Sequence, residues 1–512
     1  MHGDPKEFEL KLELAETKLP DVAAAAASKQ FATGKPRRQR LLSIYFDTPK
    51  HALRHAGITL RLRCVDGNWV QTVKLGTGVH GGISNPTEIE APVPGKKLRL
   101  DLIPSGRVRK KLRKLTADKA LAPIFRNHVV RTTHRLKSAR TETELALDSG
   151  CIRSATQTAA ICEAELELKT GGTEQLLEIA QHLFADIPFR FGSQSKAERG
   201  YRLAEFDRRA GYAPVKAPKT RLHPADSVAD AFAHICQSTV DQILGNWRGI
   251  QNGDDPEFAH QMRVGLRRLR TTLRIFRDAI DNPAMRTLIR DLGRMGRRVG
   301  ELRDADVLLA DIAQPILQSS ASQDGAHQLE DLLERHGDTV RECLRQEFKQ
   351  TGWNELLLQV SLLPHGAGWS NDVKHGGKIR RYARKALKKC WKTVARQAED
   401  LNALTIEERH ALRKDLKTLR YTVEFFSPVL PAGKCRKFIG RLKVLQDSFG
   451  YLNDVALAQT LPEIAADAPE QSPELHQAVG YLLGWHSRHA DDEWAHTQQQ
   501  WHQLQQQPKP WK

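Results

Sequence analysis

Glu7-Phe8-Glu9-Leu10-Lys11-Leu12-Glu13-Leu14 decides the fold of the first part of this chain, because charged and apolar residues alternate in it without exception. Successive side chains of a β-strand point to opposite faces, so one face of this segment is apolar and the other is charged. A half-buried strand with a solvated polar face is the ordinary interpretation of such a pattern. The segments that follow indicate whether the charged face is exposed to solvent or forms a functional site.

The same alternation recurs in seven further segments before residue 206, so the sequence predicts eight strands. These segments are 41–47, 59–65, 69–74, 87–91, 129–135, 142–148 and 161–169. Eight antiparallel strands suffice to close a small barrel. Most of them place charged residues two or four positions apart on one face, namely Arg61 and Arg63; Glu88 and Glu90; Arg131 and Arg135; Glu142, Glu144 and Asp148; and Glu163, Glu165, Glu167 and Lys169.

These charged faces point either to water or into the barrel. Small barrels usually have an apolar interior, and the charges then lie outside. A surface in water has no need for charge pairs that recur on strand after strand, so we favour a charged lumen with an apolar outer layer that packs on helices. Carboxylates are ligands that Mg²⁺ and Mn²⁺ prefer, and Arg and Lys neutralise phosphate oxygens. The lumen is therefore predicted to hold a metal and a polyphosphate.

The whole chain of 512 residues is basic, with 79 Lys and Arg against 61 Asp and Glu and a formal charge of +18. This balance favours a polyanionic partner such as nucleic acid, polyphosphate or anionic lipid. Seven scattered cysteines without a C-x-x-C pair fit a reducing compartment. No apolar run is long enough to span a bilayer, and the first residues lack the apolar core of a secretory signal. We therefore expect a soluble, cytoplasmic protein with no membrane partner.

Two domains are predicted from a change of pattern along the chain. Alternating segments occupy residues 1–206, and helical periodicity begins at about residue 225 and continues to residue 506. The segment 207–224 between them is rich in Pro and basic residues, as linkers often are. The second domain is predicted to be an all-α helical bundle.

An internal repeat organises this helical part. His260-x-x-Arg263 returns 150 residues later as His410-x-x-Arg413, and the Leu-x-Asp segment that ends at Asp304 returns as the one that ends at Asp454. Internal repetition of this kind predicts two related halves. On a helix, each copy forms a cationic stripe, with His260, Arg263, Arg267, Arg270 and Arg274 in the first and His410, Arg413, Lys417 and Arg420 in the second.

These stripes favour a bound anion, because like charges at helical spacing repel each other and a solvated face commonly mixes signs. Neither His260 nor His410 has a second ligand at metal spacing, so we interpret both as anion contacts or helix-orienting groups. Aromatic residues make up only 6% of the chain and do not interleave the stripes. Nucleic acid is therefore a less suitable partner than polyphosphate.

The motif Glu7-x-Glu9-x-Lys11 resembles the E-x-E-x-K hallmark of the CYTH family, also called the triphosphate tunnel metalloenzymes. Further matching stretches follow in order over residues 5–205: Ile44 to Pro49, Leu60-Arg61-Leu62-Arg63, Lys74, Glu88 with Glu90, Cys162 to Leu168, and Ser195 to Tyr201. The resemblance implies an α+β domain, in which an eight-stranded antiparallel β-barrel tunnel with flanking helices holds a linear triphosphate and a divalent metal.

Site residues follow from the same resemblance. The implied metal ligands, for Mg²⁺ or Mn²⁺, are Glu7, Glu9, Glu163, Glu165 and Glu167. The implied phosphate-binding residues are Lys11, Arg61, Arg63, Lys74, Arg131, Arg135, Lys196 and Arg199, although Lys196 and Arg199 also fit a basic helix turn outside the tunnel. The implied catalytic residues are Glu7, Glu9, Lys11, Arg61, Arg63 and Lys74. Glu88, Glu90 and Asp148 are left open between supporting the metal site and forming salt bridges inside the barrel.

The helical region resembles the CHAD domain over residues 225–505, on the evidence of its His-x-x-Arg stripes and Leu-x-Asp segments. This resemblance implies that the stripes bind inorganic polyphosphate and that Asp304 and Asp454 hold Arg side chains in place. Together the two resemblances predict metal-dependent hydrolysis of inorganic triphosphate to diphosphate and phosphate. A thiamine triphosphatase, a class IV-type adenylate cyclase and a non-catalytic polyphosphate-binding protein of polyphosphate granules stay open as alternatives.

Overall fold

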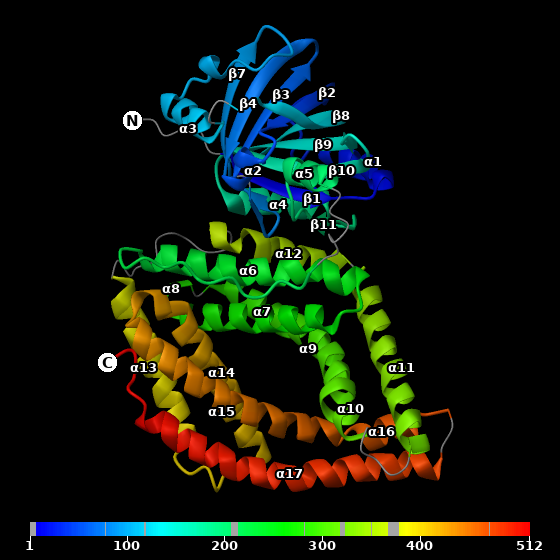
Figure 1. Ribbon diagram of the computed structural model, residues 1–512, viewed down its shortest axis with the longest axis vertical. Coiled ribbons are helices and arrows are strands. Elements are labelled where there is room, and N and C mark those ends of the chain that lie inside the picture. The colour runs from blue at the N-terminus through cyan, green and yellow to red at the C-terminus, as the bar shows by residue number, and fades with distance from the viewer. Residues whose placement is uncertain are drawn as a thin grey trace. The chain divides into compact units, whose positions relative to one another are not determined.

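The computed structural model describes residues 7–76, 78–116, 119–205, 213–280, 282–317, 323–349, 351–366, 378–469 and 472–512. It forms two compact units, one containing a β-sheet and one built from helices (Figure 1). The first comprises Met1–Ala213 with Gln350–Gly368, and the second comprises Pro214–Lys349 with Trp369–Lys512. Of the predicted linker, residues 207–212 lie outside the described residues, and 213–223 form neither helix nor strand.

Eleven strands form one antiparallel sheet in the described part of the first unit. They are β1 Glu9–Glu13, β2 Arg37–Asp47, β3 Ile58–Val65, β4 Asn68–Leu75, β5 Val79–His80, β6 Ile83–Ser84, β7 Thr87–Val93, β8 Ala122–Ser138, β9 Thr141–Arg153, β10 Thr158–Thr170 and β11 Arg190–Phe191. Their order is β5-β6-β1-β10-β9-β8-β2-β3-β4-β7, and β11 pairs with β1. All eight predicted segments are strands, so the predicted antiparallel fold is confirmed.

The sheet curls into a half-barrel (Figure 1). Pairing of β6 with β1 brings its two ends together. β6 pairs with β1 and places Ser84 opposite Glu9, and only two residues separate β6 from β7. The amide nitrogen of Glu7 donates to the carbonyl oxygen of Pro86 at 3.0 Å, immediately before β7 begins. The curled sheet therefore encloses one concave face, which alternate residues of every strand line.

Helices cover the outer face of this sheet. The short α2, Ala52–His55, and α3, Gly106–Thr116, bury the apolar residues of β3, β4 and β7 that point away from the concave face. Val108 and Leu112 of α3 join Leu60, Val73 and Ile89 in one cluster. α4, Thr173–Leu183, packs across β8, β9 and β10, and α1, Leu19–Ala26, packs on α4. The apolar outer layer predicted from strand alternation is thus present.

One end of the concave face is apolar rather than charged, which the sequence reasoning did not predict. α5, Lys196–Ala204, packs against β8 and β9. Its Tyr201 meets Phe125 edge-on, with ring centroids 5.3 Å apart, and Phe125 stacks on Tyr45 at 4.5 Å. Val129 and Ile161 complete this cluster. The charged lumen therefore occupies only part of the length of the strands.

A helix from the second half of the sequence belongs to the first unit. This helix, α12 (Thr351–Leu362), packs on α4. Near its end, Ser361 Oγ donates to the carbonyl oxygen of Gly81 at 2.5 Å, and the His365 ring meets the Phe8 ring edge-on at 5.0 Å. Phe8 stands between Glu7 and Glu9 in the sequence. The segment therefore contacts the chain next to both glutamates.

The second unit is all-helical in its described residues, as predicted. Its helices are α6 Val228–Asn252, α7 Pro256–Ile275, α8 Arg277–Ile280, α9 Pro283–Val307, α10 Gln314–Leu317, α11 Gln323–Phe348, α13 Ile379–Gln397, α14 Ile406–Phe426, α15 Ala432–Ala458, α16 Leu461–Ala466 and α17 Pro473–Gln506. α6, α7 and α9 recur as α13, α14 and α15 at the offset of the sequence repeat. Among the described residues, no helix is apolar over a length that would cross a bilayer.

Packing within the repeat brings the two cationic stripes together. α7 packs on α6, α9 and α14, and α14 packs on α13 and α15. Ser227 and Thr405 begin α6 and α14 with capping boxes. In each, the cap hydroxyl accepts a hydrogen bond from the backbone N–H three residues later, and the carboxylate of that residue accepts one from the backbone N–H of the cap. The stripes of α7 and α14 therefore lie on neighbouring helices with defined starting points.

Candidate active site

The concave face of the sheet holds a cavity of about 620 Å³, which is lined mostly by charged and small polar side chains. Its charged lining residues are Glu7, Glu9, Lys11, Arg61, Arg63, Lys74, Glu88, Glu90, Arg131, Glu144, Glu165, Glu167, Lys169 and Lys196. Strand register brings opposite charges face to face, because Lys11 pairs with Glu165 and Lys74 pairs with Glu88. The charged strand faces predicted from the sequence thus meet in one enclosed space.

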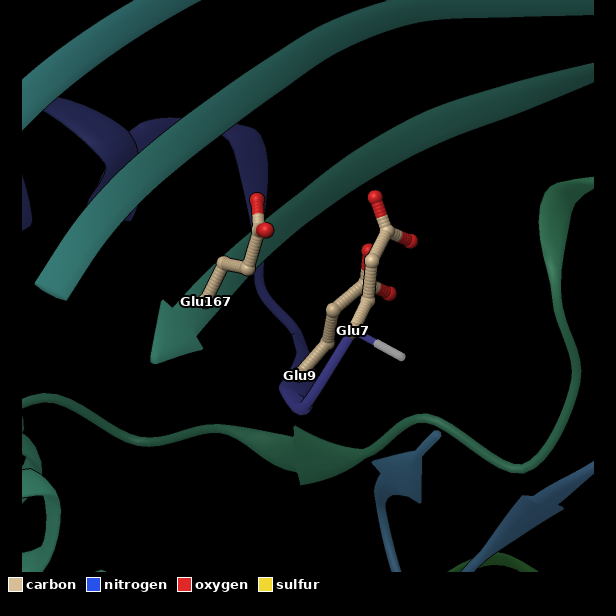
Figure 2. Close-up of side chains that lie close together, drawn as sticks. All are labelled: Glu7, Glu9 and Glu167. Atoms are coloured by element: carbon tan, nitrogen blue, oxygen red, sulfur yellow. The ribbon is translucent and has the colours of Figure 1, made fainter. Parts of the chain in front are cut away.

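Three glutamates of this cavity converge, Glu9 from β1, Glu7 from the residues just before β1, and Glu167 from the neighbouring β10. Figure 2 shows the side chains of Glu7 and Glu9 beside that of Glu167, which β10 supplies. One carboxylate oxygen from each lies within 4.8 Å of the others. Oxygen ligands on opposite sides of a Mg²⁺ ion are about 4.2 Å apart, since each bond is about 2.1 Å long. Small side-chain rotations would therefore allow all three to bind one ion.

The three carboxyl groups differ in protonation. Burial and the neighbouring Glu88 carboxyl group raise the pKa of Glu7 to about 8. Burial also raises the pKa of Glu167. Burial alone would raise the pKa of Glu9 as well, but the ammonium group of Lys11 outweighs it and lowers that pKa. Such crowding of carboxyl groups is what a bound cation would relieve.

A second acidic cluster lies deeper in the sheet. Asp148, Glu163 and Glu165 are all buried, and their carboxylate oxygens lie within 4.8 Å of one another. Two cations hold them together: Lys196 Nζ is 2.8 Å from Asp148 Oδ2, and Arg131 donates to both oxygens of Asp148 at 2.7 Å. Burial opposes ionisation of Asp148, yet Lys196 and Arg131 lower its pKa. Lys11, which lies 2.5 Å from Glu165, is a third cation, so side chains of the protein match the three carboxylates in number.

Ion pairs also hold most of the other cations of the cavity. Lys11 Nζ lies 2.5 Å from both Glu9 Oε2 and Glu165 Oε1. Lys74 Nζ lies 2.7 Å from Glu7 Oε2 and from Glu88 Oε2. Arg61 donates to Glu88 at 2.9 Å. Lys11 and Lys74 are thus each held between two glutamates.

Arg63 is different, because no carboxylate among the described residues forms an ion pair with it. Its Nε donates to Ser43 Oγ at 3.1 Å. Burial, together with the positive charges of Arg61 and Arg131, lowers the pKa of Arg63 to about 10. A buried guanidinium group without a counter-charge is costly unless an anion compensates it. The cavity is therefore prepared for an anion at Arg63.

The balance of charges bears on how an anion enters. Of the described residues that line the cavity, seven carry a carboxylate and seven are Lys or Arg. A polyphosphate entering alone would therefore meet as many acidic as basic side chains. A divalent cation bound to Glu7, Glu9 and Glu167 would neutralise these groups and free Lys11 and Lys74 to contact phosphate. The residues present thus fit a divalent metal that accompanies the anion.

The second unit holds its own cavity, of about 690 Å³, between α7, α9 and α14. Basic side chains dominate its described lining, namely Arg263, Arg267, Arg270, Arg274, Arg297, His410, Arg413, Lys414 and Lys417, against Glu301 and Asp304. Burial, with Arg267 and Arg413 nearby, lowers the pKa of Lys417 to about 6. Burial and Arg267 likewise lower the pKa of Arg413 to about 10. Positive charge is thus concentrated here beyond what the acidic residues balance.

Glycines of α9 provide room for these basic groups. Gly293, Gly296 and Gly300 all line the cavity. A methyl group at Gly300 would lie 3.4 Å from Cζ of Arg263, and one at Gly293 would lie 3.6 Å from Cζ of Arg270. Larger side chains at these positions would occupy the space in which the guanidinium groups lie.

Comparison with known families decides what these two cavities belong to. The family model described as the CYTH domain matches residues 5–201, and the one described as the CHAD domain matches residues 234–462. This chain contains a CYTH domain followed by a CHAD domain. Both resemblances drawn from the sequence motifs are confirmed. The concave cavity lies in the CYTH domain, and the basic cavity lies in the CHAD domain.

Three relatives place this chain among known proteins. A Haemophilus influenzae protein named inorganic triphosphatase is 28% identical over 206 residues, which cover 39% of this chain and 55% of that protein, so the match spans about half of its length. An uncharacterized Mycobacterium tuberculosis protein is 27% identical over 421 residues, 75% of each chain. The crystal structure of the CHAD domain from Ricinus communis has 26% identity and a TM-score of 0.47, and the match covers 56% of this chain and 95% of that one.

Most predicted CYTH site residues meet in the concave cavity, but four are not among its described lining residues, namely Arg135, Asp148, Glu163 and Arg199. Glu163 lies beneath the lining, where its carboxylate contacts Lys196. Arg199 is on the far side of Glu163, at 3.8 Å, and also donates to the carbonyl oxygen of Ala160. Arg135 is exposed on β8, beyond the part of the strand that lines the cavity. Lys196, whose place the sequence left open, reaches the cavity from the start of α5.

The residues left open between two roles also find places. Asp148 binds Arg131 and Lys196 and is fully buried. Glu88 forms ion pairs with Arg61 and Lys74. Glu90 is half exposed and accepts from Thr72 Oγ1 at 3.0 Å. All three therefore take part in salt bridges or hydrogen bonds within the barrel.

In the CHAD domain, the cavity gathers most of both stripes. His260 and Arg420 are not among its described lining residues, and Arg420 instead lies 3.8 Å from Glu424. Asp304 accepts from Arg263 at 2.6 Å, as predicted. The prediction for Asp454 does not hold in the same form, because Asn453 makes the hydrogen bonds to His410 and Arg413, each at 3.0 Å. Asn453, the residue before Asp454, thus holds an Arg side chain, as was predicted for Asp454, and it also contacts His410.

Sequence reasoning missed several lining residues. In the CYTH cavity these are Glu144 and Lys169, which stand on charged strand faces but received no role, and Tyr45. In the CHAD cavity they are Arg297 and Lys414, which lie outside the stripes. One available signal was the spacing of Gly293, Gly296 and Gly300, which places small residues along one side of α9.

Proposed function

We propose that this protein is a divalent-metal-dependent hydrolase that cleaves inorganic triphosphate to diphosphate and phosphate in the cavity of its CYTH domain. The observation that carries the proposal is the meeting of Glu7, Glu9 and Glu167 in one cavity with Arg63, which forms no ion pair with a carboxylate of the described residues. Phosphoryl transfer needs positioning and charge stabilisation rather than a nucleophilic side chain, and this cavity offers both. The name of the Haemophilus influenzae relative supports the same reaction.

Each group of residues has a task in this reaction. Glu7, Glu9 and Glu167 would hold Mg²⁺ or Mn²⁺, because both ions prefer oxygen ligands. Such an ion, when bound, supplies charge neutralisation and polarises the phosphoryl group. Arg63, Lys11 and Lys74 would bind the phosphate oxygens, and Arg61 and Arg131 would add positive charge around them. Asp148 and Glu163 orient Lys196 at the wall of the cavity.

The lining favours inorganic triphosphate over its organic derivatives. Tyr45 is the only aromatic residue among the described lining residues. Adenine or thiamine would need an apolar surface next to the phosphate site, as cofactor pockets commonly provide. We therefore expect the inorganic substrate to be preferred.

Substrate preference tests this proposal. The purified full chain, with Mg²⁺ or Mn²⁺, should turn over tripolyphosphate with a kcat/KM at least about tenfold above that for thiamine triphosphate or ATP, since the latter two gain no ring contact. Phosphate release and cyclic AMP formation are measured on the same preparation. Faster turnover of thiamine triphosphate, or formation of cyclic AMP, would show that the substrate is an organic triphosphate and contradict the proposal. Absence of turnover with all three would leave only a binding function.

We infer further that the CHAD cavity binds inorganic polyphosphate. Burial and the nearby Arg267 lower the pKa of both Lys417 and Arg413, and the cavity has only two described carboxylates in its lining. A chain of phosphates offers closely spaced negative charges without bases that require stacking. Binding should weaken with increasing salt, because it releases counterions from the polymer.

Lys417 gives polyphosphate binding a specific pH dependence. Its pKa of about 6 in the free protein leaves its amine mostly neutral at about pH 7.5, and a bound polyanion should restore the charge, so binding should take up about one proton. Affinity should therefore increase as pH falls from about 9 to about 6 and level off below. Calorimetry in buffers with different ionisation enthalpies measures this uptake. Lys417→Arg should keep the affinity but abolish the uptake, and an unchanged uptake in that variant would contradict the assignment.

A further inference from the structure

The CHAD domain contains another cavity, of about 660 Å³, between α13 on one side and α7, α8 and α14 on the other. We call it the α13 cavity. Arg274 and Thr418 line both it and the basic CHAD cavity, so the two are neighbours. Only Arg274 belongs to the cationic stripes, and neither proposal above assigns a role to the α13 cavity.

One wall of the α13 cavity is a row of cations. Arg381, Lys385 and Lys389 follow each other at intervals of four residues on α13, and Lys378 precedes them at the helix start. All four side chains are exposed, and no carboxylate of the described residues forms an ion pair with any of them. α13 itself contains no Asp or Glu. Because like charges at this spacing repel each other, a bound anion would stabilise this helix face.

The floor of the cavity is apolar and aromatic. Tyr382, Ala386, Ile275 and Val228 all line it. Tyr382 is held in place, since its hydroxyl donates to the carbonyl oxygen of Ile275 at 2.9 Å and its ring stacks on Phe276 with centroids 5.1 Å apart. Burial raises the pKa of the Tyr382 phenol, so it stays a hydrogen-bond donor. An inorganic polyanion would gain nothing from this apolar surface.

Acceptor groups lie within the same lining. Asp415 accepts from Gln397 Nε2 at 3.0 Å and lies 3.8 Å from Arg274, and Asp278 lines the cavity from α8. Carboxylates of α14 and α8 that line the same cavity as the cationic wall disfavour a ligand made only of phosphate. They suit a ligand that also brings amino or hydroxyl donors, and the volume is within the usual range for pockets that hold such molecules.

We propose that the α13 cavity binds a nucleoside di- or triphosphate. The phosphates lie along Arg381, Lys385 and Lys389, the base lies on the floor at Tyr382 and Ala386, and Asp278 or Asp415 accepts a hydrogen bond from the base or the ribose. This assignment uses all three kinds of lining group, whereas inorganic polyphosphate uses only the first and an uncharged nucleoside only the other two. The site is independent of the hydrolysis proposed for the CYTH domain.

Binding of ATP to the full chain in buffer with EDTA tests the proposal by calorimetry. ATP should bind at least tenfold more tightly than tripolyphosphate to this site, and adenosine should not bind measurably. The double variant Lys385→Ala with Lys389→Ala should weaken ATP binding at least tenfold. The matched control, Lys388→Ala with Lys392→Ala, removes the same charge from exposed positions of the same helix outside the lining and should leave binding unchanged. Any binding in the CYTH cavity is common to both double variants and cancels in their comparison.

A second variant separates the base from the phosphates. Ala386→Leu extends an apolar side chain over the floor without changing charge, and it should weaken ATP binding while leaving tripolyphosphate binding unchanged. Equal losses in the two lysine double variants would indicate unspecific charge attraction and overturn the proposal. Equal affinities of ATP and tripolyphosphate in the part of the binding that the Lys385→Ala with Lys389→Ala variant loses, or unchanged ATP binding in Ala386→Leu with native helical content, would also overturn it.

Discussion

Replacing Glu9 by Gln is expected to lower kcat/KM for inorganic triphosphate at least about 100-fold, because a direct ligand matters at least as much as a group that only orients one. Glu9 is 7% exposed, and its carboxylate lies between Lys11 and Lys74, within reach of Glu7 and Glu167. The amide keeps the shape of the side chain but loses the charge that a metal needs. Lys11 keeps its contact with Glu165, so the strand should keep its place.

The matched control is Glu142→Gln. Glu142 stands on β9, is exposed and lies 3.6 Å from Lys137, an ion pair that is expected to contribute little. Activity of this variant should equal that of the unchanged protein. Metal affinity, measured by the Mg²⁺ or Mn²⁺ concentration for half-maximal activity, should change in Glu9→Gln only. Full activity of a folded Glu9→Gln protein would contradict the proposal that Glu9, with Glu7 and Glu167, holds the metal.

The second large effect is expected in the CHAD domain. Replacing Arg267 and Lys417 together by Ala should weaken binding of long-chain polyphosphate about 100-fold, since each charge-assisted contact contributes about 1.5–3 kcal/mol. Both residues line the basic cavity, and no carboxylate among the described residues forms an ion pair with either. Their removal also relieves repulsion within the cavity, so the domain should remain folded. Hydrolysis of inorganic triphosphate should be unchanged.

Lys443→Ala serves as the control for this pair. Lys443 is exposed on α15 and lies outside the basic cavity, so its loss removes a charge without touching the site. The salt dependence of binding should become shallower in the double variant and stay the same in Lys443→Ala. If both proteins lost affinity equally, net charge rather than the cavity would account for polyphosphate binding.

The sequence predicts the charged face of the sheet because period-two alternation translates directly into sides of a strand. Once Glu9, Arg61 and Glu165 occupy one side of their strands, any curled antiparallel pairing brings them together. The alternation along a strand does not predict which other elements pack against its charged side. Tyr45 and Val129 stand on the same side as these charges, yet α5 packs over them and makes that end apolar.

Long-range contacts are the part that the sequence does not reveal. The apolar segment of α12 fits a core of either unit, and nothing in its local pattern indicates that Ser361 and His365 contact Gly81 and Phe8. In the CHAD domain the repeat predicts which residues are equivalent, but it does not predict that Arg297 of α9 joins the stripes. Such partners depend on helix packing, which a periodicity along one chain segment does not determine.

Phosphate release from tripolyphosphate by the full chain, first without metal and then with added Mg²⁺ or Mn²⁺, tests the central claim most directly. The equal numbers of carboxylates and cations around the CYTH cavity predict no release in the absence of a divalent metal and rapid release once it is added. Release that continues undiminished in EDTA, or none at any metal concentration, would contradict the account.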